Sequence, residues 1–250
     1  MEVSLIDKMG TDLTVVNAAR VSFNKESDWE FKEAFPSGPG FPVKYDPHLS
    51  EKDQKLIKYL ATHNHWTPFS HVQITMREKV PIFVARQRFK HMVGFTYNEV
   101  SRRYVDEAPE FYIPETWRGA PEGSKKQGSS EKDVSLEVSM TFGSIEAFHK
   151  RMAEAYQMLL DAGVAPEQAR MVLPQSMYTE YYVTGSLAAW ARAYNLRSAK
   201  DAQKEIQELA GQWDKIISDI TELKYSWEAI KDGSKTNSTP TQELREGNSV

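Results

Sequence analysis

The strongest constraint on the fold is the change in apolar spacing along the chain. Residues 72–80 read VQITMREKV, an alternation that predicts a strand with one buried face. Residues 144–162 and 199–227 instead repeat apolar side chains every three or four positions, which predicts amphipathic helices. The chain shows no regular strand–helix alternation and no GxGxxG loop, which argues against a Rossmann sheet. We therefore expect an α+β fold, in which a mixed or antiparallel sheet packs with long helices.

Shorter patterns complete the expected order of elements. Strands are also predicted over residues 2–7 and 178–184, and helices over residues 15–20, 81–92, 166–173 and 187–195. Residues 24–50 are rich in Pro, Gly and aromatics, and residues 115–135 in Gly, Ser and Lys, so both predict long loops. The last twenty residues are polar and predict a disordered tail. We expect a single domain over residues 1–230, followed by this tail over residues 231–250.

The composition excludes several kinds of chemical site and binding partner. The 250 residues include no cysteine, which excludes disulfides, thiolate metal sites and cysteine nucleophiles together. The formal net charge of −4 does not favour non-specific binding to nucleic acid. No apolar run is long enough to cross a membrane, and the N-terminus lacks the apolar stretch of a secretory signal. A cytoplasmic protein without a membrane partner is therefore the expectation.

The most informative segment is residues 86–104, RQRFKHMVGFTYNEVSRRY. On a helix, Gln87, Lys90 and His91 would share one face, because they stand at positions i, i+3 and i+4. After Gly94 the chain must turn, and a second polar group follows: Asn98, Glu99, Ser101, Arg102 and Arg103. Guanidinium forks and hydroxyls suit a ligand that carries a phosphate and a hydrogen-bonding ring. The alternative interpretation is a solvated basic face followed by a polar loop.

These residues resemble the signature of the flavin-dependent thymidylate synthases. That family carries Arg-His-Arg, a spacer and then an Asn-Glu-x-x-Ser-x-Arg-Tyr-like run; here residues 90–92 read KHM and residues 98–104 read NEVSRRY. Four further blocks are similar to the family and keep its order: residues 18–23 (AARVSF), 63–71 (HNHWTPFSH), 169–179 (ARMVLPQSMYT) and 194–206 (YNLRSAKDAQKEI). The resemblance covers residues 10 to 210 and implies the family's fold and activity.

The chain also departs from the family pattern. The two signature arginines stand here as Lys90 and Met92, and one extra residue separates this triplet from Asn98. Lysine keeps the charge but not the fork, and Met92 offers only its main chain and thioether. Ser186 and Arg192 stand where the family usually has other polar residues, and the loop over residues 24–50 is longer than usual.

The resemblance implies roles residue by residue. It assigns dUMP binding to Gln87, Arg88, Phe89, Lys90, Glu99, Val100, Ser101, Arg102, Arg103, Arg170 and Arg197. It assigns FAD binding to Ser22, Thr67, Lys90, His91, Met92, Asn98, Glu99, Ser186 and Arg192. Arg103 and Arg170 are the expected phosphate ligands. The catalytic candidates are Arg197, which would stabilise negative charge on the uracil ring, and Ser101, for which binding is favoured over nucleophilic attack because no base lies near it in sequence.

The implied reaction is the reductive methylation of dUMP to dTMP. FAD would carry hydride, NADPH would supply the electrons, 5,10-methylenetetrahydrofolate would donate the carbon, and the enzyme would be a homotetramer with active sites at subunit interfaces. No metal is expected, since His63, His65 and His71 have no acidic companions. Two rivals remain: a flavoprotein that has kept only NADPH oxidase activity, and a non-enzymatic nucleic-acid binder, which the acidic net charge disfavours.

Overall fold

The computed structural model describes residues 1–33, 45–105, 107–121, 128–130, 132–134 and 143–233. These residues fall into two compact units. Unit 1 contains the described residues within 1–6, 75–184 and 197–212; unit 2 contains those within 7–74, 185–196 and 213–250. Each unit is described by itself, and the expectation of a single domain over residues 1–230 stays a prediction.

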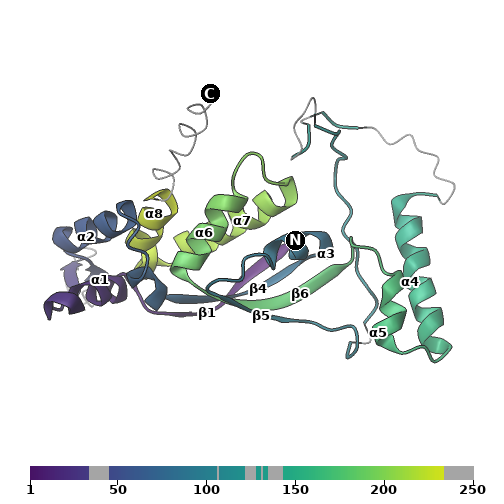
Figure 1. Ribbon diagram of the computed structural model, residues 1–250, viewed down its shortest axis with the longest axis horizontal. Coiled ribbons are helices and arrows are strands. Elements are labelled where there is room, and N and C mark those ends of the chain that lie inside the picture. The colour runs from purple at the N-terminus through teal and green to yellow at the C-terminus, as the bar shows by residue number, and fades with distance from the viewer. Residues whose placement is uncertain (34–44, 106, 122–127, 131, 135–142, 234–250) are drawn as a thin grey trace, which may run out of the picture. The chain divides into compact units, whose positions relative to one another are not determined.

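A four-stranded sheet has the order β1-β4-β6-β5 (Figure 1). Its strands are β1 (Glu2–Met9), β4 (Gln73–Pro81), β6 (Tyr178–Ser186) and β5 (Phe95–Glu99). Three of them confirm the predicted strands, whereas β5 was expected only as part of a turn and loop. The combination of this sheet with eight helices among the described residues confirms the α+β class.

Burial alternates along the two central strands. Met76, Glu78 and Val80 of β4 are buried, as are Tyr181 and Val183 of β6, whereas residues between them are partly or fully exposed. A sheet with this pattern has one covered face and one open face. Glu78 is a carboxylate at an otherwise apolar buried position, so it must have a polar partner inside unit 1.

Helix α3 (Ile82–Arg88) is shorter than the helix predicted over residues 81–92. Beyond Arg88 the backbone hydrogen bonds reach only three residues back instead of four. The N–H of Lys90 donates to the carbonyl of Gln87 at 3.3 Å, and that of His91 donates to the carbonyl of Arg88 at 3.1 Å. Gly94 then takes a φ of +80°, which a glycine adopts without strain. The prediction that Gln87, Lys90 and His91 share one helix face is therefore wrong, because Lys90 and His91 lie on a turn after the helix.

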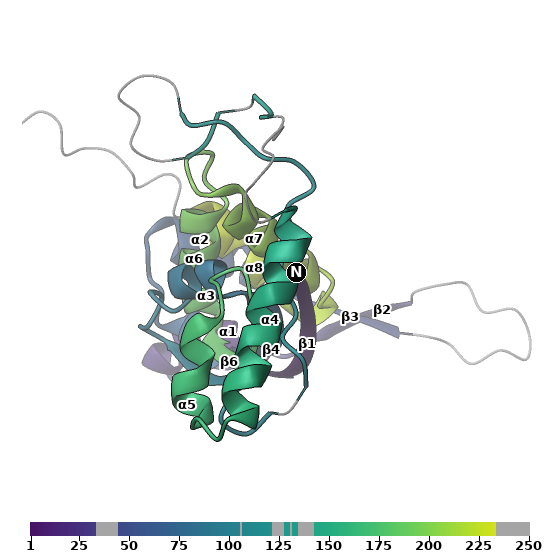
Figure 2. The same ribbon diagram turned by 90° about the vertical axis from the view of Figure 1, so that its right-hand side faces the viewer.

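The other helices of unit 1 include α4 (Ile145–Asp161) and α5 (Pro166–Ala169), which lie beside one another (Figure 2). The Oγ of Ser144 accepts the N–H of Ala147 at the start of α4. Gly163, at a φ of +81°, follows its end and confirms the expected glycine stop. The helix predicted over residues 166–173 is split, because α5 passes into the 3-10 helix η3 (Arg170–Val172).

Unit 2 holds α1 (Asp12–Arg20), η1 (Val21–Phe23), α2 (Glu51–Thr62), η2 (Pro68–His71), η4 (Thr221–Leu223) and α8 (Lys224–Gly233). It also holds α6 (Leu187–Arg197) except for Arg197, and the end of α7 (Lys204–Ser218). Helices α2 and α8 lie side by side (Figure 1). Trp190, Trp213 and Trp227 are fully buried, and the rings of Trp190 and Trp213 meet edge to face at 5.5 Å.

The single long helix predicted over residues 199–227 is wrong, since α7 ends at Ser218 and α8 begins at Lys224. The start of α8 is held by a residue that is distant in sequence. The carboxylate of Asp12 accepts the N–H groups of Tyr225 and Ser226 at 3.0 and 2.8 Å, which caps the first turn of α8.

The described ends of the segment 24–50 form a two-stranded antiparallel sheet, β2 (Glu30–Glu33) with β3 (Tyr45–His48), in which Glu30 stands opposite His48 (Figure 2). The prediction of an uninterrupted loop is therefore wrong here, and residues 34–44 lie outside the described part. The predicted loop 115–135 includes one bridge, between Arg118 and Asp133. The predicted tail begins inside α8, and residues 234–250 lie outside the described part. No described helix is long and apolar enough to span a membrane.

Candidate active site

Arg197 forms the centre of one group of candidate residues in unit 1. Its Nε donates to the Nε2 of His91 at 2.8 Å, and its Nη2 donates to the main-chain carbonyl of Gln87 at 3.2 Å. Because Nε2 of His91 accepts, a neutral imidazole at this position carries its proton on Nδ1. The structure thus brings together three candidate residues from two separate stretches of the sequence.

The electrostatics of Arg197 favour an anion. Burial lowers the pKa of its guanidinium, and the nearby positive charge of Arg88 lowers it further. Its hydrogen-bond acceptors, the Nε2 of His91 and the main-chain carbonyl of Gln87, are not carboxylates. A partly desolvated cation that has no counter-ion among the described residues is electrostatically unsatisfied, so a negative charge placed against it is stabilised.

The side chain of Gln87 points to a second glutamine. Its Nε2 donates to the Oε1 of Gln203, and the Nε2 of Gln203 donates to the Oε2 of Glu205 at 2.8 Å. Glu205 is also paired with Arg118. Burial alone would raise the pKa of Glu205, but its hydrogen bonds from Arg118 and Gln203 lower it, so the carboxylate stays ionised.

A buried polar network lies beneath the turn that carries Lys90 and His91. The Nε of Arg88 is 3.3 Å from the Oε1 of Glu78, and both side chains are fully buried. The hydroxyl of Tyr181 donates to the other carboxylate oxygen of Glu78 at 2.6 Å. The guanidinium of Arg88 therefore faces the interior of unit 1 and leaves little surface for the predicted contact with substrate.

Tyr97 extends this network to β5. Its hydroxyl lies 2.7 Å from the carbonyl of His91 and 2.6 Å from the Nη1 of Arg88. Burial raises the pKa of Tyr97 to about 12, so the group stays a neutral hydroxyl at physiological pH. Tyr181 is even more enclosed, and burial followed by the charge of Glu78 raises its pKa well above the ordinary value.

A second group of candidates lines a cavity of about 710 Å³ in unit 1. Glu99, Val100, Arg102 and Arg170 belong to its lining, and the Oγ1 of Thr179 donates to Glu99 at 2.6 Å. Next to it, the Nε of Arg103 donates to the Oγ of Ser101 at 3.3 Å. The lining of this cavity does not include Gln87, Lys90, His91 or Arg197, so one chain places the candidate dUMP ligands at two separate positions.

Ion pairing differs among the arginines. Four have carboxylate partners: Arg20 pairs with Asp53, Arg77 with Glu180, Arg88 with Glu78 and Arg118 with Glu205. Four candidate arginines form no ion pair with any described residue: Arg102, Arg103, Arg170 and Arg197. Guanidinium groups that have no carboxylate partner in the described part of the chain can bind a phosphate.

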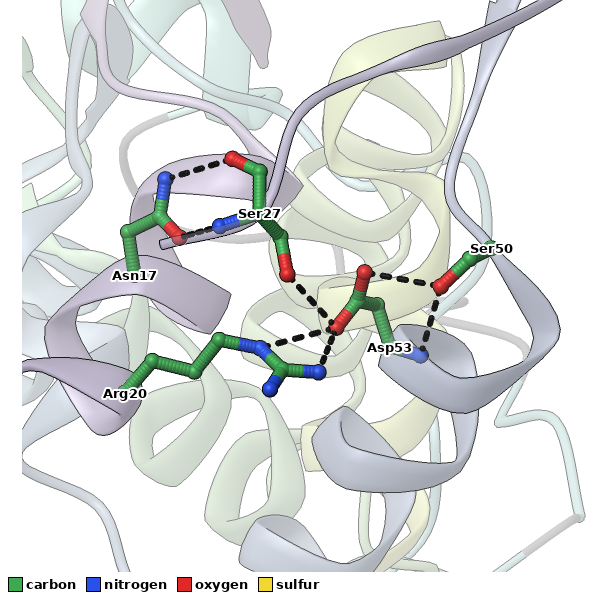
Figure 3. Close-up of polar contacts among 5 residues, drawn as sticks. All are labelled: Asn17, Arg20, Ser27, Ser50 and Asp53. Atoms are coloured by element: carbon green, nitrogen blue, oxygen red, sulfur yellow. Dashed lines mark hydrogen bonds and ion pairs between the residues drawn. The ribbon is translucent and has the colours of Figure 1, made fainter. Parts of the chain in front are cut away.

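Four of the candidate FAD ligands lie in unit 2. Ser22 is exposed on η1, which follows α1 directly. Figure 3 shows how this segment is held: Asp53 accepts from the Nε of Arg20 at 3.0 Å and from the Oγ of Ser27 at 3.1 Å. Ser50 caps α2 and donates to the same carboxylate at 2.8 Å. Burial alone would raise the pKa of Asp53, but these hydrogen bonds lower it, so the carboxylate stays ionised. It thereby holds Arg20 and Ser27, which lie on either side of Ser22 in the sequence.

The remaining three candidates in unit 2 differ in availability. Thr67 is exposed immediately before η2, and Arg192 lines a hollow of about 210 Å³ together with Trp66. Ser186 is buried, and its Oγ accepts the N–H of Ala189 at 3.2 Å at the start of α6. That hydroxyl is therefore already engaged in the protein, which weakens the prediction that it contacts FAD.

The remaining candidates of unit 1 lie on or near the turn after α3. Lys90 and Met92 are exposed there, while Asn98 is exposed on β5 and Phe89 is half-buried. The ring of Phe89 packs edge-on against Tyr97 and Tyr181, so its contact is with the protein core.

The comparison with protein families shows which family the chain belongs to. The model for the family described as thymidylate synthase complementing protein matches residues 4–221. A flavin-dependent thymidylate synthase from Thermosipho africanus is 39% identical over 89% of this chain and 86% of its own. The chain belongs to the flavin-dependent thymidylate synthase family. A family member from Thermus thermophilus is 34% identical over 92% of this chain and 75% of its own.

Solved structures agree with this family assignment. The crystal structure of a UMP/dUMP methylase, PolB from Streptomyces cacaoi, bound with 5-Br dUMP, matches with a TM-score of 0.70. The match has 26% sequence identity and covers 92% of this chain and 94% of PolB. As in other members of the flavin-dependent thymidylate synthase family, the chain is thus an enzyme of the methyltransferase type.

The sequence did not reveal the support beneath these residues. Gln203, Tyr97 and Tyr181 were not expected at the site. Gln203 and Tyr181 reach it through contacts distant in sequence, and Tyr97 reaches it from β5, a strand that the sequence pattern did not predict. Glu78 did carry a signal: the alternation of residues 72–80 placed a carboxylate on the same face as Ile74 and Met76. A charge on a buried strand face requires an internal partner, and that partner is Arg88.

Proposed function

We propose that this flavin-dependent thymidylate synthase family member converts dUMP, 5,10-methylenetetrahydrofolate, NADPH and a proton into dTMP, tetrahydrofolate and NADP⁺. The proposal is supported by family membership and by the dUMP analogue bound to PolB. The chain has no cysteine, so a route that begins with thiolate attack on the uracil ring is closed to it. The single observation that carries the proposal is the set of four arginines without carboxylate partners, described above.

Arg103 and Arg170 bind the phosphate of dUMP in this proposal, with Arg102 close by. Neither Arg103 nor Arg170 has an ion pair among the described residues, and a guanidinium fork matches two phosphate oxygens. Ser101 has its Oγ beside the Nε of Arg103 and no base at hand, so it serves binding and not attack. Glu99 is held by Thr179 and accepts hydrogen bonds from the substrate.

Arg197 acts on the uracil ring. It cannot be a base, because its guanidinium stays protonated even with a lowered pKa. Its charge is partly desolvated and has no counter-ion among the described residues, so it stabilises negative charge that develops on the ring when hydride is accepted at C6. His91 and Gln87 hold the guanidinium from the protein side, so it is oriented before the substrate arrives.

The residues of unit 2 fit part of a flavin nucleotide. Arg192 and Trp66 line a hollow of about 210 Å³ that has apolar walls, and Thr67 follows Trp66 directly. A guanidinium, a hydroxyl and an indole suit a pyrophosphate and an aromatic ring. In this proposal Thr67 and Arg192 bind FAD at this hollow. The other predicted FAD ligands are Ser22 of the same unit and Lys90, His91, Met92 and Asn98 of unit 1. When bound, FAD would supply hydride transfer from NADPH to the uracil ring.

A homotetramer with active sites at subunit interfaces accounts for the division of the candidates. Each of the two positions in unit 1 has free guanidinium groups but only part of the predicted ligand set. Exposed apolar side chains lie beside both of them, including Met92 at 74% and Met171 at 79% relative exposure. Surfaces of this kind are typical of protein contacts.

A second candidate substrate is UMP, since PolB is described as a methylase of both UMP and dUMP. The decisive experiment incubates the purified, flavin-loaded protein with [5-³H]dUMP or [5-³H]UMP, the folate and NADPH, and measures tritium release. We expect release from dUMP that depends on both co-substrates. Flavin-dependent NADPH oxidation without tritium release would support the oxidase rival, and a protein that retains no flavin would overturn the proposal.

A further inference from the structure

We propose that Tyr97 is a positioning residue: its hydroxyl fixes the turn over residues 88–91 and, through that turn, the pairing of His91 with Arg197. This inference rests on the proposed function, in which Arg197 acts on the pyrimidine. Tyr97 does not itself contact the substrate. It fixes the position of His91, which holds Arg197, the residue that acts on the pyrimidine.

The hydroxyl of Tyr97 lies where three groups of the turn converge. It is 2.7 Å from the carbonyl of His91, 3.3 Å from the carbonyl of Arg88 and 2.6 Å from the Nη1 of Arg88. A hydroxyl has one proton to donate, and of the two carbonyls that of His91 is the nearer. Tyr97 therefore donates to the carbonyl of His91 and accepts from the Nη1 of Arg88. One oxygen thereby joins the main chain at His91 to the side chain of Arg88.

The Arg88 end of this connection cannot move. Its guanidinium is paired with Glu78, both side chains are fully buried, and Glu78 also accepts from Tyr181. Breaking an ion pair in such surroundings leaves a charge without compensation, which is costly. The charged pair therefore acts as a fixed support, and Tyr97 connects the turn to it.

Aromatic packing restricts Tyr97 from the sides. The ring of Phe89 meets Tyr97 edge to face at 5.0 Å and Tyr181 at 4.8 Å. The guanidinium carbon of Arg88 lies 4.3 Å from the ring centre of Phe95 and 5.2 Å from that of Tyr97. Close packing on several sides leaves Tyr97 few alternative rotamers.

The positions of two chemistry-bearing segments follow from this. The turn carries His91, whose Nε2 accepts from Arg197, while β5 carries Glu99 two residues beyond Tyr97. This turn also has Lys90 and Met92 where the family signature has arginines, and it is one residue longer than the family pattern. Tyr97 and the Glu78–Arg88 pair anchor it from the interior.

The test removes one oxygen atom. We compare Tyr97→Phe with a matched control, Tyr182→Phe, whose ring is half-exposed on β6. In the flavin-loaded holoenzyme we expect the dissociation constant of dUMP, followed by the flavin absorbance change, to rise roughly fivefold to tenfold in Tyr97→Phe, as for a lost hydrogen bond. The control should stay within about twofold of the parent, a difference below that of one hydrogen bond. Equal affinities in the two variants would overturn the inference.

A double-mutant cycle with Arg197→Lys separates positioning from a general loss of stability. If Tyr97 acts through Arg197, its effect on dUMP binding should largely disappear in the Arg197→Lys background, because the two changes are coupled. Additive effects would refute positioning. Should Tyr97→Phe fail to fold, Tyr181→Phe loosens the same support one contact further away and should weaken dUMP binding in the same direction; unchanged binding there would count against the idea.

A crystal structure of Tyr97→Phe tests the inference without an activity measurement. We expect the hydrogen bond between Arg197 and His91 to be lost or lengthened, and an unchanged 2.8 Å contact would overturn the inference. A parent enzyme that releases no tritium from dUMP would refute the proposed function, whereas an active parent with an unaffected Tyr97→Phe variant would refute only the role of Tyr97.

Discussion

Asp12 offers a test of the fold through its ionisation. Its side chain is fully buried in unit 2, and its two carboxylate oxygens accept the N–H groups of Tyr225 and Ser226. Burial raises the pKa of Asp12 from 3.8 to about 6, even though the hydrogen bonds at the start of α8 act in the opposite direction. Desolvation of the charge therefore outweighs the favourable contacts, and the folded state holds the proton more tightly than the unfolded chain.

The sign of the effect follows from this difference. A carboxyl group whose pKa is raised by folding stabilises the folded state below its unfolded pKa, and this stabilisation is lost as the pH rises through the folded pKa. A shift from 3.8 to about 6 corresponds to about 3 kcal/mol in total, at about 1.4 kcal/mol per pKa unit. Between about pH 4.5 and about pH 7 the loss is about 2 kcal/mol, because the unfolded group is already largely ionised at the lower pH.

The perturbation is Asp12→Asn, which keeps the shape but cannot ionise. The amide loses one of the two acceptor positions, but that cost is the same at every pH. We expect the unfolding free energy of the parent, measured by urea denaturation, to fall by about 2 kcal/mol relative to the variant between about pH 4.5 and about pH 7. Other titrating groups cancel in the comparison. Parallel pH profiles, or a parent that gains relative stability as the pH rises, would refute the reasoning.

Three further outcomes are expected. Arg197→Ala should retain FAD but lose dTMP formation by at least about a hundredfold, as for a removed electrostatic contact; unchanged turnover in the tritium assay would contradict its role. Arg170→Ala should raise the KM for dUMP by about tenfold or more, the value of a charged hydrogen bond, whereas Lys150→Ala on exposed α4 should not. Arg88→Met should destabilise the protein by about 3–5 kcal/mol, and the double change with Glu78→Leu should recover most of that; equal melting temperatures for the single and double variants would argue against a buried pair.

The strands and most helices could be predicted because their patterns are local. Residues 72–80 alternate, and burial along β4 follows that alternation. The boundary of α3 could not be predicted in this way, since residues 81–92 keep a helical pattern beyond Arg88. Beyond Arg88 the N–H groups of Lys90 and His91 instead bond to carbonyls three residues back, and the hydroxyl of Tyr97 on β5 binds the carbonyl of His91. A local pattern carries no record of such a partner.

The break between α7 and α8 has the same origin. The apolar stripe from Leu209 to Leu223 is continuous in sequence, yet the structure ends one helix and caps the next with Asp12, more than two hundred residues earlier in the chain. The candidate site was likewise predictable only in part. The predicted phosphate ligands stand out by residue type, but the sequence cannot say which arginines already have a carboxylate, as Arg88 does.

The arginines without carboxylate partners have a practical consequence for work with the purified protein. Arg102, Arg103, Arg170 and Arg197 leave positive charge uncompensated among the described residues, so sulfate, phosphate or chloride from the medium will compete for the same donors as a nucleotide. Apparent affinities for dUMP will therefore decrease as such anions are added, and thermal stability will increase with them, since ligands that bind the folded state shift unfolding by mass action. Two laboratories that use different buffers would thus measure different constants for one and the same enzyme.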